Sequence, residues 1–352
     1  MDIDDTPPSP DEIELTVFGP GYGEAVILHL GNNNWMLVDS CIYPATKQPV
    51  SLYYLNRIGV SPSSVCTIVA SHWHDDHVQG LSVLVQEFSD AEFFISGVFN
   101  KKEMLSFLSA YGGLDISLKG TNELYRSITA KATPNFAHQR TILYEQMIGT
   151  RQIRVSAFSP TSKAQAQSKL HYAKYLPEIG GDRTAFAPDL SPNIEAVVIH
   201  IDLVDDGILL GSDLEDHPVG WSAVLSDSWC TGRQLATVYK AAHHGSITGD
   251  NREIWEKLLK KTPFVSLTPF INGSTSIPRE ADRIRIRGLA EAAFISSGTS
   301  RRPRMGHEIE KRLSDICTEL SLVNPGFGGV RFRKKFGATK WNVALFGDAD
   351  LL

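Results

Sequence analysis

The stretch SHWHDDHVQG, residues 71–80, places three histidines and two aspartates within six consecutive positions. The apolar run CTIVA (66–70) precedes it and predicts a buried strand, whereas LSVLVQEF (81–88) follows with helical spacing. Binding sites commonly form where such elements end, and imidazole and carboxylate groups suit zinc, manganese or iron. We therefore predict a metal site at this strand end, with four candidate ligands: His72, His74, Asp76 and His77.

Two later segments end in polar side chains in the same way. Asp213 follows the apolar run GILLGS (207–212), and His243 and His244 follow ATVYKAA (236–242). Four ligands within six residues cannot easily surround one ion, so these segments are candidates for the remaining ligands. A carboxylate can also bridge two ions about 3.5–4 Å apart. Taken singly, Asp213 could cap a helix and the histidine pair could form a turn.

The pattern of apolar runs predicts sheets packed between helices. Strands are predicted at IELTVF (13–18), AVILHL (25–30) and WMLVDS (35–40), which are separated by Gly and Asn clusters typical of turns. Helices are predicted at VSLYYLNRIG (50–59) and REIWEKLLKK (252–261). The chain has no GxGxxG opening a helix, no GxxxxGK[ST] and no GxSxG. Their absence argues against a dinucleotide fold, a P-loop enzyme and an α/β-hydrolase.

The 352 residues, 42% of them hydrophobic, can bury a large core. We expect residues 1–12 to be a disordered lead-in, residues 13–352 to form a single domain, and residues 161–192 to be a loop or insertion. The acidic start is unlike a secretory signal, and no run of about 18 apolar residues predicts a membrane helix. The four cysteines are far apart and form no CxxC, so we expect a reduced, cytoplasmic protein without a membrane partner.

The order of these motifs resembles the metallo-β-lactamase superfamily, most closely the soluble hydrolase domain of the competence protein ComEC. The shared features begin with a Gly-rich hairpin ending at Asp39 and the H-x-H-x-D-H motif after a strand. An N-x-x-S/A strand that begins NIEA (193–196) follows, then LLGSD, HHGS and a late Gly-His in RMGHEIEKRL (304–313). They extend from residue 15 to about residue 320. The resemblance implies an α+β fold, a four-layer αββα sandwich with a metal site at one edge.

The resemblance also implies how the ligands divide between one or two divalent ions, zinc or manganese. His72 and His74 would hold one ion, and Asp213 would bridge to the other. The second ion would be held by Asp76, His77 and one histidine of the pair, either His243 or His244. The remaining histidine of that pair could donate a proton.

The chain departs from the superfamily pattern at one position, where a third histidine is expected between the first motif and Asp213. The aligned segment, SAFSPTS (156–162), has Ser159 and Pro160 there. The histidines in this interval, which we expect to be structural, are His138, His171 and His200. The first ion would then be held more weakly and be completed by water or substrate oxygens, as manganese and magnesium often are.

Three features favour a phosphate-containing substrate, either nucleic acid or a nucleotide. The ComEC branch is thought to act as a nuclease. Residues 251–352 carry 18 Lys or Arg against 11 Asp or Glu, whereas the first 250 residues have a net charge of −13. Arginine is also well shaped for bidentate phosphate contacts. The predicted substrate-binding residues are Arg301, Arg302, Arg304 and Ser246.

In the predicted reaction a metal-held hydroxide attacks phosphorus in line. Asp76 would orient it or take its proton, and His307 or a histidine of the pair would protonate the leaving oxygen. The predicted catalytic residues are Asp76, His244 and His307. Two alternatives stay open. One is hydrolysis of a lactone, β-lactam or other acyl ester, which would favour an apolar pocket with few arginines. The other is a non-catalytic, metal-binding regulatory module.

Overall fold

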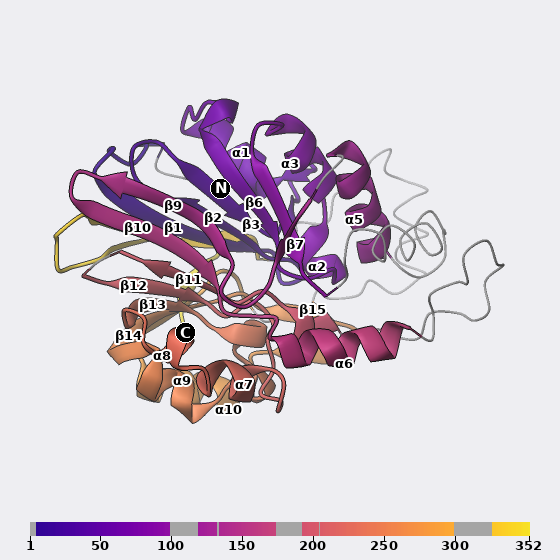
Figure 1. Ribbon diagram of the computed structural model, residues 1–352. Helices are drawn as coiled ribbons and strands as arrows, with labels where there is room; N and C mark the ends of the chain where they lie inside the picture. The colour runs from indigo at the N-terminus through magenta and orange to yellow at the C-terminus, as the bar shows by residue number, and fades with distance from the viewer. Residues whose placement is uncertain (1–4, 99–118, 132–133, 174–191, 204, 299–325) are drawn as a thin grey trace, which may run out of the picture.

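The computed structural model describes residues 5–98, 119–131, 134–173, 192–203, 205–298 and 326–352, and within them the chain forms two large mixed sheets (Figure 1). The first sheet has the order β19 (Asn342–Gly347), β18 (Gly328–Lys335), β1 (Glu12–Gly19), β2 (Ala25–His29), β3 (Trp35–Val38), β6 (Val65–Ala70), β7 (Glu92–Ser96) and β8 (Asn135–Ala137). The second has the order β20 (Asp350–Leu351), β17 (Ala292–Ile295), β14 (Leu259–Leu267), β13 (Ala236–Lys240), β12 (Gly207–Leu210), β11 (Ile199–Asp202), β10 (Arg151–Ala157) and β9 (Ile142–Ile148).

Helices cover the outer face of each sheet (Figure 1). Those on the first sheet and near the motif are α1 (Val50–Arg57), α2 (Asp75–Val78), α3 (Leu81–Glu87) and α5 (Lys119–Ala130). The others are α6 (Ser162–Tyr172), α7 (Trp221–Leu225), α8 (Ser228–Thr231), α9 (Arg252–Lys257) and α10 (Glu280–Leu289). Short pieces complete the fold: β4 (Ile42–Tyr43), β5 (Gln48–Pro49), β15 (Phe270–Asn272), β16 (Thr275–Ile277), and the 3₁₀ turns η1 (Pro62–Ser64), η2 (Pro192–Glu195), η3 (Ala242–Gly245) and η4 (Ile247–Gly249).

Three apolar cores lie between the four layers. Val17 points into the core between the two sheets, whereas its neighbour Phe18 packs towards the helices of the first sheet. In the second sheet Ile208 faces the same central core, and Leu209 packs with Trp221 of α7 on the outer side. Strands buried on both faces have continuous apolar runs, because neither face meets water. The predicted α+β fold, a four-layer αββα sandwich, is confirmed.

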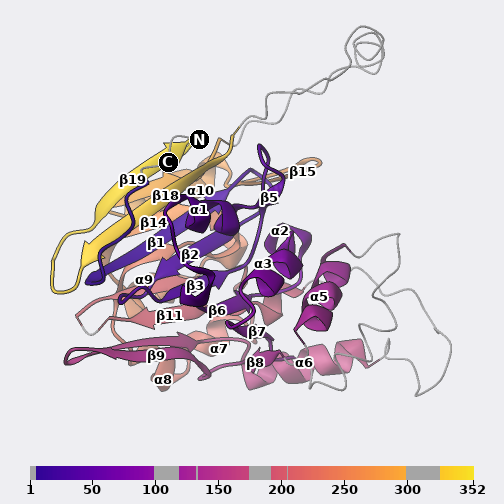
Figure 2. The ribbon, with the colours of Figure 1, turned by 90° about the horizontal axis from the view of Figure 1, so that it is seen from above.

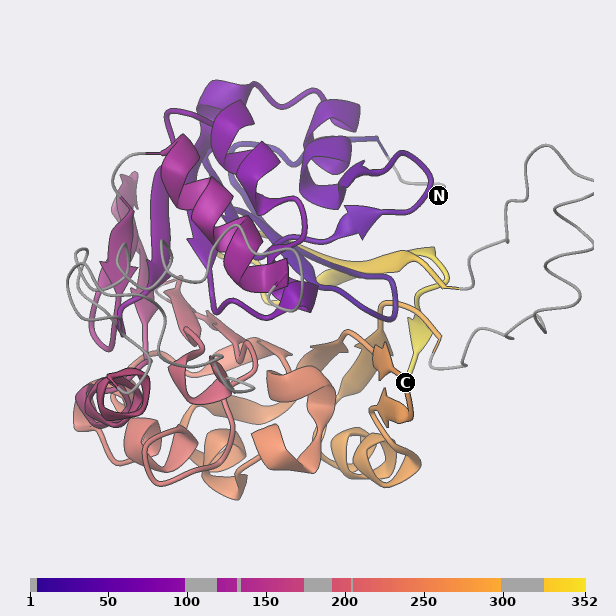
Figure 3. The same ribbon diagram turned by 90° about the vertical axis from the view of Figure 1, so that its right-hand side faces the viewer.

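Each sheet has a block of parallel strands, and these blocks set the position of the site. β3, β6, β7 and β8 are parallel in the first sheet, and β12, β13, β14 and β17 are parallel in the second. Parallel neighbours end at the same edge of a sheet, where sites commonly form. The edge that carries α2 and β15 faces the viewer in Figure 3.

Segments near both ends of the described chain lie side by side at the first sheet. β18 pairs antiparallel with β1, from Glu12 opposite Lys335 to Gly19 opposite Gly328, so β18 and β19 extend the first sheet (Figure 2). The final strand, β20, pairs with β17 of the second sheet. Residues 5–11 lie against the first sheet as well, and the carbonyl of Thr6 accepts a hydrogen bond from Arg333.

The predicted hairpin strands are confirmed as β1, β2 and β3, and the helix predicted at 50–59 is confirmed as α1. The helix predicted at 252–261 is wrong beyond Lys257. Leu259 begins β14 instead, because parallel pairing with β13 places it opposite Ala236. Within the expected loop or insertion at 161–192, Ser162–Tyr172 forms α6. No helix among the described residues is both long enough and apolar enough to cross a bilayer.

Candidate metal centre

The polar side chains of the site come from neighbouring strand ends in both sheets. Asp39 directly follows β3, and Ser71 and His72 follow the adjacent strand β6. Across the interface, Asp213 lies three residues after β12, and Thr268 directly follows β14. Two parallel blocks that end at one edge therefore bring together residues more than 200 positions apart in the sequence.

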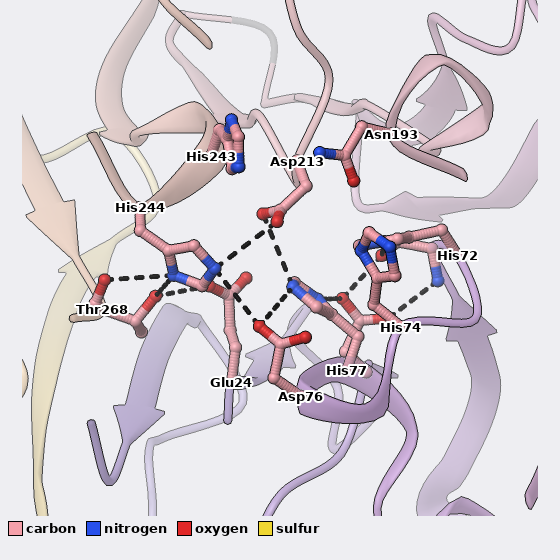
Figure 4. A network of polar contacts seen from close by, with 12 residues as sticks. Glu24, His72, His74, Asp76, His77, Asn193, Asp213, His243, His244 and Thr268 are labelled. Atoms are coloured by element: carbon pink, nitrogen blue, oxygen red, sulfur yellow. Dashed lines mark hydrogen bonds and ion pairs between the residues drawn. The ribbon is translucent and has the colours of Figure 1, made fainter. Parts of the chain in front are cut away.

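One cluster, here called the four-ligand group, consists of Asp76, His77, Asp213 and His244, whose ligating atoms all lie within 4.8 Å of one another (Figure 4). His77 Nε2 is 3.5 Å from Asp76 Oδ2 and 3.4 Å from Asp213 Oδ1. His244 Nε2 is 3.3 Å from Asp76 Oδ2 and 3.4 Å from Asp213 Oδ2. All four side chains are buried.

The ligating atoms of this group have the properties that a metal ion requires. Within the part of the chain that the structure describes, four of these atoms are buried and make no hydrogen bond: Asp76 Oδ2, His77 Nε2, Asp213 Oδ1 and His244 Nε2. Buried polar atoms without a partner are unfavourable, and native proteins rarely leave four of them together. Because two carboxylates and two imidazoles converge here, the residues fit a divalent cation.

Second contacts orient the two histidines of the four-ligand group. His77 Nδ1 lies 2.7 Å from Asp39 Oδ2, and Asp39 also accepts hydrogen bonds of 2.7 Å from the backbone N–H and the hydroxyl of Ser71. His244 Nδ1 lies 3.0 Å from the hydroxyl of Thr268. Such contacts fix the Nδ1–H tautomer and leave Nε2 as the ligand atom.

A buried ion pair supports His244 from behind. The hydroxyl of Thr268 donates to Glu24 Oε2 at 2.5 Å, so its oxygen is left to accept from His244 Nδ1. Lys240 Nζ lies 2.5 Å from the same Glu24 oxygen, and the lysine is fully buried. The backbone N–H of Glu24 also donates to the carbonyl of Asp76 at 2.8 Å. Sequence reasoning missed Glu24, Lys240 and Thr268, because none of them lies in a recognisable motif.

A second cluster, here called the three-ligand group, consists of His72, His74 and Asp213. His72 Nε2 and His74 Nδ1 lie 3.1 Å apart, and His72 Nδ1 lies 3.0 Å from the hydroxyl of Ser71. His72 is buried, whereas His74 is half-buried. Asp213 belongs to both groups, which is the arrangement expected of a carboxylate that bridges two ions.

The electrostatics of the two groups differ. Burial alone lowers the pKa of His77, but the carboxylates of Asp213, Asp76 and Asp39 raise it well above its usual range. Burial likewise opposes the charge of His244, yet Asp213 and Asp76 raise its pKa to about 9. Burial lowers the pKa of His72 well below its usual value, and His77 and His74 add to this effect. The carboxylates of the four-ligand group thus stabilise positive charge at its centre. The His72 imidazole stays neutral, which metal binding requires of a histidine.

The backbone conformation separates the two histidines of the pair. His243 and His244 both have positive φ, 46° and 55°, which is uncommon for residues other than glycine and is typical of functional sites. His244 enters the four-ligand group. His243 belongs to neither group. Its Nδ1 lies 2.7 Å from the hydroxyl of Thr248 and 3.2 Å from Glu215 Oε1.

The other predicted site residues have different positions. The Ser246 hydroxyl accepts a hydrogen bond from the backbone N–H of Thr248 and caps η4, so it is used within its own turn. The remaining candidates lie outside the described residues: Arg301, Arg302, Arg304 and His307.

The residues near the expected position of a third histidine, and the other histidines of that interval, make structural contacts instead of joining the site. Ser159 is buried, donates to the carbonyl of Ala196 at 2.5 Å and accepts from the N–H of Val198 at 2.8 Å. His200 Nε2 lies 2.8 Å from the carbonyl of Gln234, and its ring stacks on Phe158. Neither of the two groups includes His138, His171 or His200.

The first half of the site matches a known family. Residues 18–104 match the model of the metallo-beta-lactamase superfamily. This segment, about a quarter of the chain, contains Asp39 and the motif from His72 to His77. A search of curated proteins finds no match.

Solved structures that are described as metallo-beta-lactamases match this chain at low sequence identity. The metallo-beta-lactamase SMB-1 bound to 2-mercaptoethanesulfonate is 13% identical, with 68% of this chain and 82% of that chain covered and a TM-score of 0.35. A putative metallo-beta-lactamase from Thermotoga maritima is 15% identical over 56% of this chain and 77% of that chain, with a TM-score of 0.32. The MIM-2 metallo-beta-lactamase is 13% identical over 82% of this chain and 89% of that chain, with a TM-score of 0.34.

Proposed function

We propose that this protein is a metal-dependent hydrolase of the metallo-β-lactamase superfamily that cleaves phosphodiester bonds in nucleic acid or nucleotides. The observation that carries the proposal is the pair of ligand groups that share Asp213. The match over residues 18–104 supports the same family. A specific relationship to the hydrolase domain of ComEC is part of the proposal and rests on the order of motifs.

Divalent ions at such a site lower the pKa of a bound water and neutralise negative charge on the substrate. The residues of the chain supply the remaining functions. Asp76 is buried beside His77 and His244, where its carboxylate can orient an attacking water or take its proton. Because His244 lies in the ligand group, His243 is the histidine of the pair left to protonate a leaving oxygen. Thr248 and Glu215 hold the His243 ring in place for that role.

Two features support a nucleotide-like substrate. Half-buried aromatic rings lie beside the four-ligand group, since the Phe270 ring centroid is 5.3 Å from that of His244 and the Tyr22 ring is 5.5 Å from Phe270. Aromatic rings are common stacking partners for bases. The basic C-terminal third, with Arg301, Arg302 and Arg304, supplies positive charge suited to phosphate. We place the activity in the cytoplasm, because the described cysteines, Cys41, Cys66 and Cys230, are free thiols.

A substrate panel tests the proposal. The purified protein is loaded with Mn²⁺ or Zn²⁺ and assayed on bis(p-nitrophenyl) phosphate, single- and double-stranded DNA, RNA, cyclic dinucleotides and a lactone. We expect phosphodiester hydrolysis that is lost on chelation and restored by Mn²⁺. Hydrolysis of the lactone alone would instead support an acyl-ester hydrolase. Tight metal binding without hydrolysis of any substrate would point to a regulatory module.

A further inference from the structure

The two ligand groups are unequal in the number of side chains that they offer. The four-ligand group has four, whereas the three-ligand group has two ring nitrogens and the shared carboxylate of Asp213. The residue at the expected position of a third histidine, Ser159, uses its hydroxyl in two backbone hydrogen bonds. Another side chain must therefore complete the three-ligand group if protein atoms are to do so.

Asn193 lies on the open side of this group. It belongs to η2, which three residues separate from β11, and in the link between them the backbone N–H of Val197 donates to the carbonyl of Ser71 at 3.0 Å. This hydrogen bond holds the Asn193 segment against the residue that precedes His72. Figure 4 shows the Asn193 amide between Asp213 and the two histidine rings of the three-ligand group. The side chain is only 5% exposed.

The orientation of the Asn193 amide follows from its one hydrogen bond. The amide nitrogen donates to Glu215 Oε1 at 3.1 Å. A carboxylate only accepts hydrogen bonds, so this contact determines which end of the amide is the NH₂ group. The amide oxygen, Oδ1, is buried and has no hydrogen-bond partner among the described residues. A buried carbonyl oxygen without a partner is unfavourable unless a cation or a water satisfies it.

We propose that Asn193 Oδ1 is the further protein ligand of the divalent ion held by His72, His74 and Asp213. This inference rests on the proposed metal-dependent function. Two imidazoles, a carboxylate and an amide oxygen form a harder ligand set than three imidazoles. The three-ligand group is therefore suited to Mn²⁺ more than a three-histidine site would be. Glu215 acts as the positioning residue that keeps the amide oxygen turned towards the ion.

Metal counting on the apoprotein tests this role without an activity assay. Free Mn²⁺ is followed by electron paramagnetic resonance as the ion is titrated into the wild type, Asn193→Leu, Asn193→Ala and the exposed-site control Asn56→Ala. We expect two equivalents in the wild type and the control. In both Asn193 variants one equivalent should bind at least about tenfold more weakly, since even supporting residues of metal sites are worth 10–100-fold.

A second pair of variants reverses the hydrogen bond while keeping an oxygen at the ligand position. In Asn193→Asp with Glu215→Gln, the new amide at 215 donates to the new carboxylate at 193, and the other carboxylate oxygen faces the ion. We expect this double variant to recover most of the lost affinity. The melting temperatures of the apoproteins should be alike, whereas a purely structural role of Asn193 would lower that of Asn193→Ala.

The outcomes separate this inference from the proposed function. Two unweakened Mn²⁺ equivalents in Asn193→Leu would overturn the ligand role and leave the metal-dependent function intact. Failure of the double variant to recover affinity, with a normal apoprotein melting temperature, would also count against it. A wild-type protein that binds no divalent ion would remove the proposed function and this inference together.

Discussion

The four-ligand group and the three-ligand group differ most in what lies behind their ligands. In the four-ligand group His77 contacts Asp39, and His244 contacts Thr268, which is backed by the buried Glu24–Lys240 pair. In the three-ligand group the neutral Ser71 hydroxyl lies behind His72, whereas His74 is half-buried and its ring contacts that of His72. Side chains with a second partner lose less freedom when they bind an ion. We therefore expect the four-ligand group to bind its ion more tightly and the three-ligand group to be the more exchangeable side.

The largest effect should come from the residue that the two groups share. Asp213→Asn removes the charge that both ions would need, so we expect loss of both Mn²⁺ equivalents. The proposed phosphodiesterase activity should fall beyond the 10–100-fold typical of a supporting residue. Metal content by mass spectrometry and steady-state kinetics measure this. The control is Asp216→Asn, an exposed carboxylate three residues further on. Retention of both ions by Asp213→Asn would contradict its bridging role.

The next-largest effect concerns the residues that support the four-ligand group rather than its ligands. Lys240→Met leaves the Glu24 carboxylate buried without its cation, and removing one partner of a buried pair costs about 3–5 kcal/mol of unfolding free energy. Urea denaturation of the apoprotein measures it. The double variant Glu24→Gln with Lys240→Met should recover part of the loss, because it removes both charges. Equal unfolding free energies of the wild type and Lys240→Met would show that the Glu24–Lys240 pair does not contribute to stability.

A smaller effect is expected from the contact behind His77. Asp39→Asn keeps the shape of the side chain but weakens its hold on His77 Nδ1, so the four-ligand group should lose about 10–100-fold in metal affinity. Thr268→Val, which removes a neutral hydroxyl behind His244, should cost less. Competition with a chromogenic chelator measures both. If Asp39→Asn weakened the binding of both metal equivalents to the same extent, the two groups would not bind their ions independently.

The smallest effect concerns a buried histidine outside both groups. Burial lowers the pKa of His200 to about 4, and the Gln234 carbonyl and the Asp202 carboxylate offset only part of this effect. The unfolded chain takes up the proton first, so stability is lost as pH falls from 6.5 towards 4. At pH 5 this loss is about 2 kcal/mol. Urea denaturation with chelator present should show a shallower acid dependence for His200→Gln, which keeps a donor for the Gln234 carbonyl. An unchanged pH slope would argue against this assignment.

Sequence reasoning reached the layered fold and most of the four-ligand group for a local reason. Polar residues that closely follow an apolar run lie at a strand end, and this holds for His72 and Asp213 without knowledge of the sheet order. His77 belongs to the same short motif as His72 but lies in α2. The resemblance to a known family added the expectation that Asp213 bridges two ions. The helix predicted through residue 261 failed because pairing with β13 outweighs the local helical spacing after Lys257.

The supporting residues could not be found in this way. Glu24, Lys240 and Thr268 are single polar residues from separate parts of the chain, and only their burial around one point gives them a role. Asn193 is the first residue of the N-x-x-S/A pattern that the resemblance places before LLGSD, but that pattern gave it no role as a ligand. Its amide oxygen became a candidate ligand because the structure leaves it buried without a partner.

The sequence by itself determined the kinds of ligand and their approximate places, because spacing along a strand and the loop after it is a local property. The tertiary structure decided which side chains share one point in space. It placed His244 rather than His243 beside Asp76, His77 and Asp213. It also placed Asn193 rather than a third histidine beside His72, because the hydrogen bond from Val197, before β11, to Ser71, after β6, holds the Asn193 segment there.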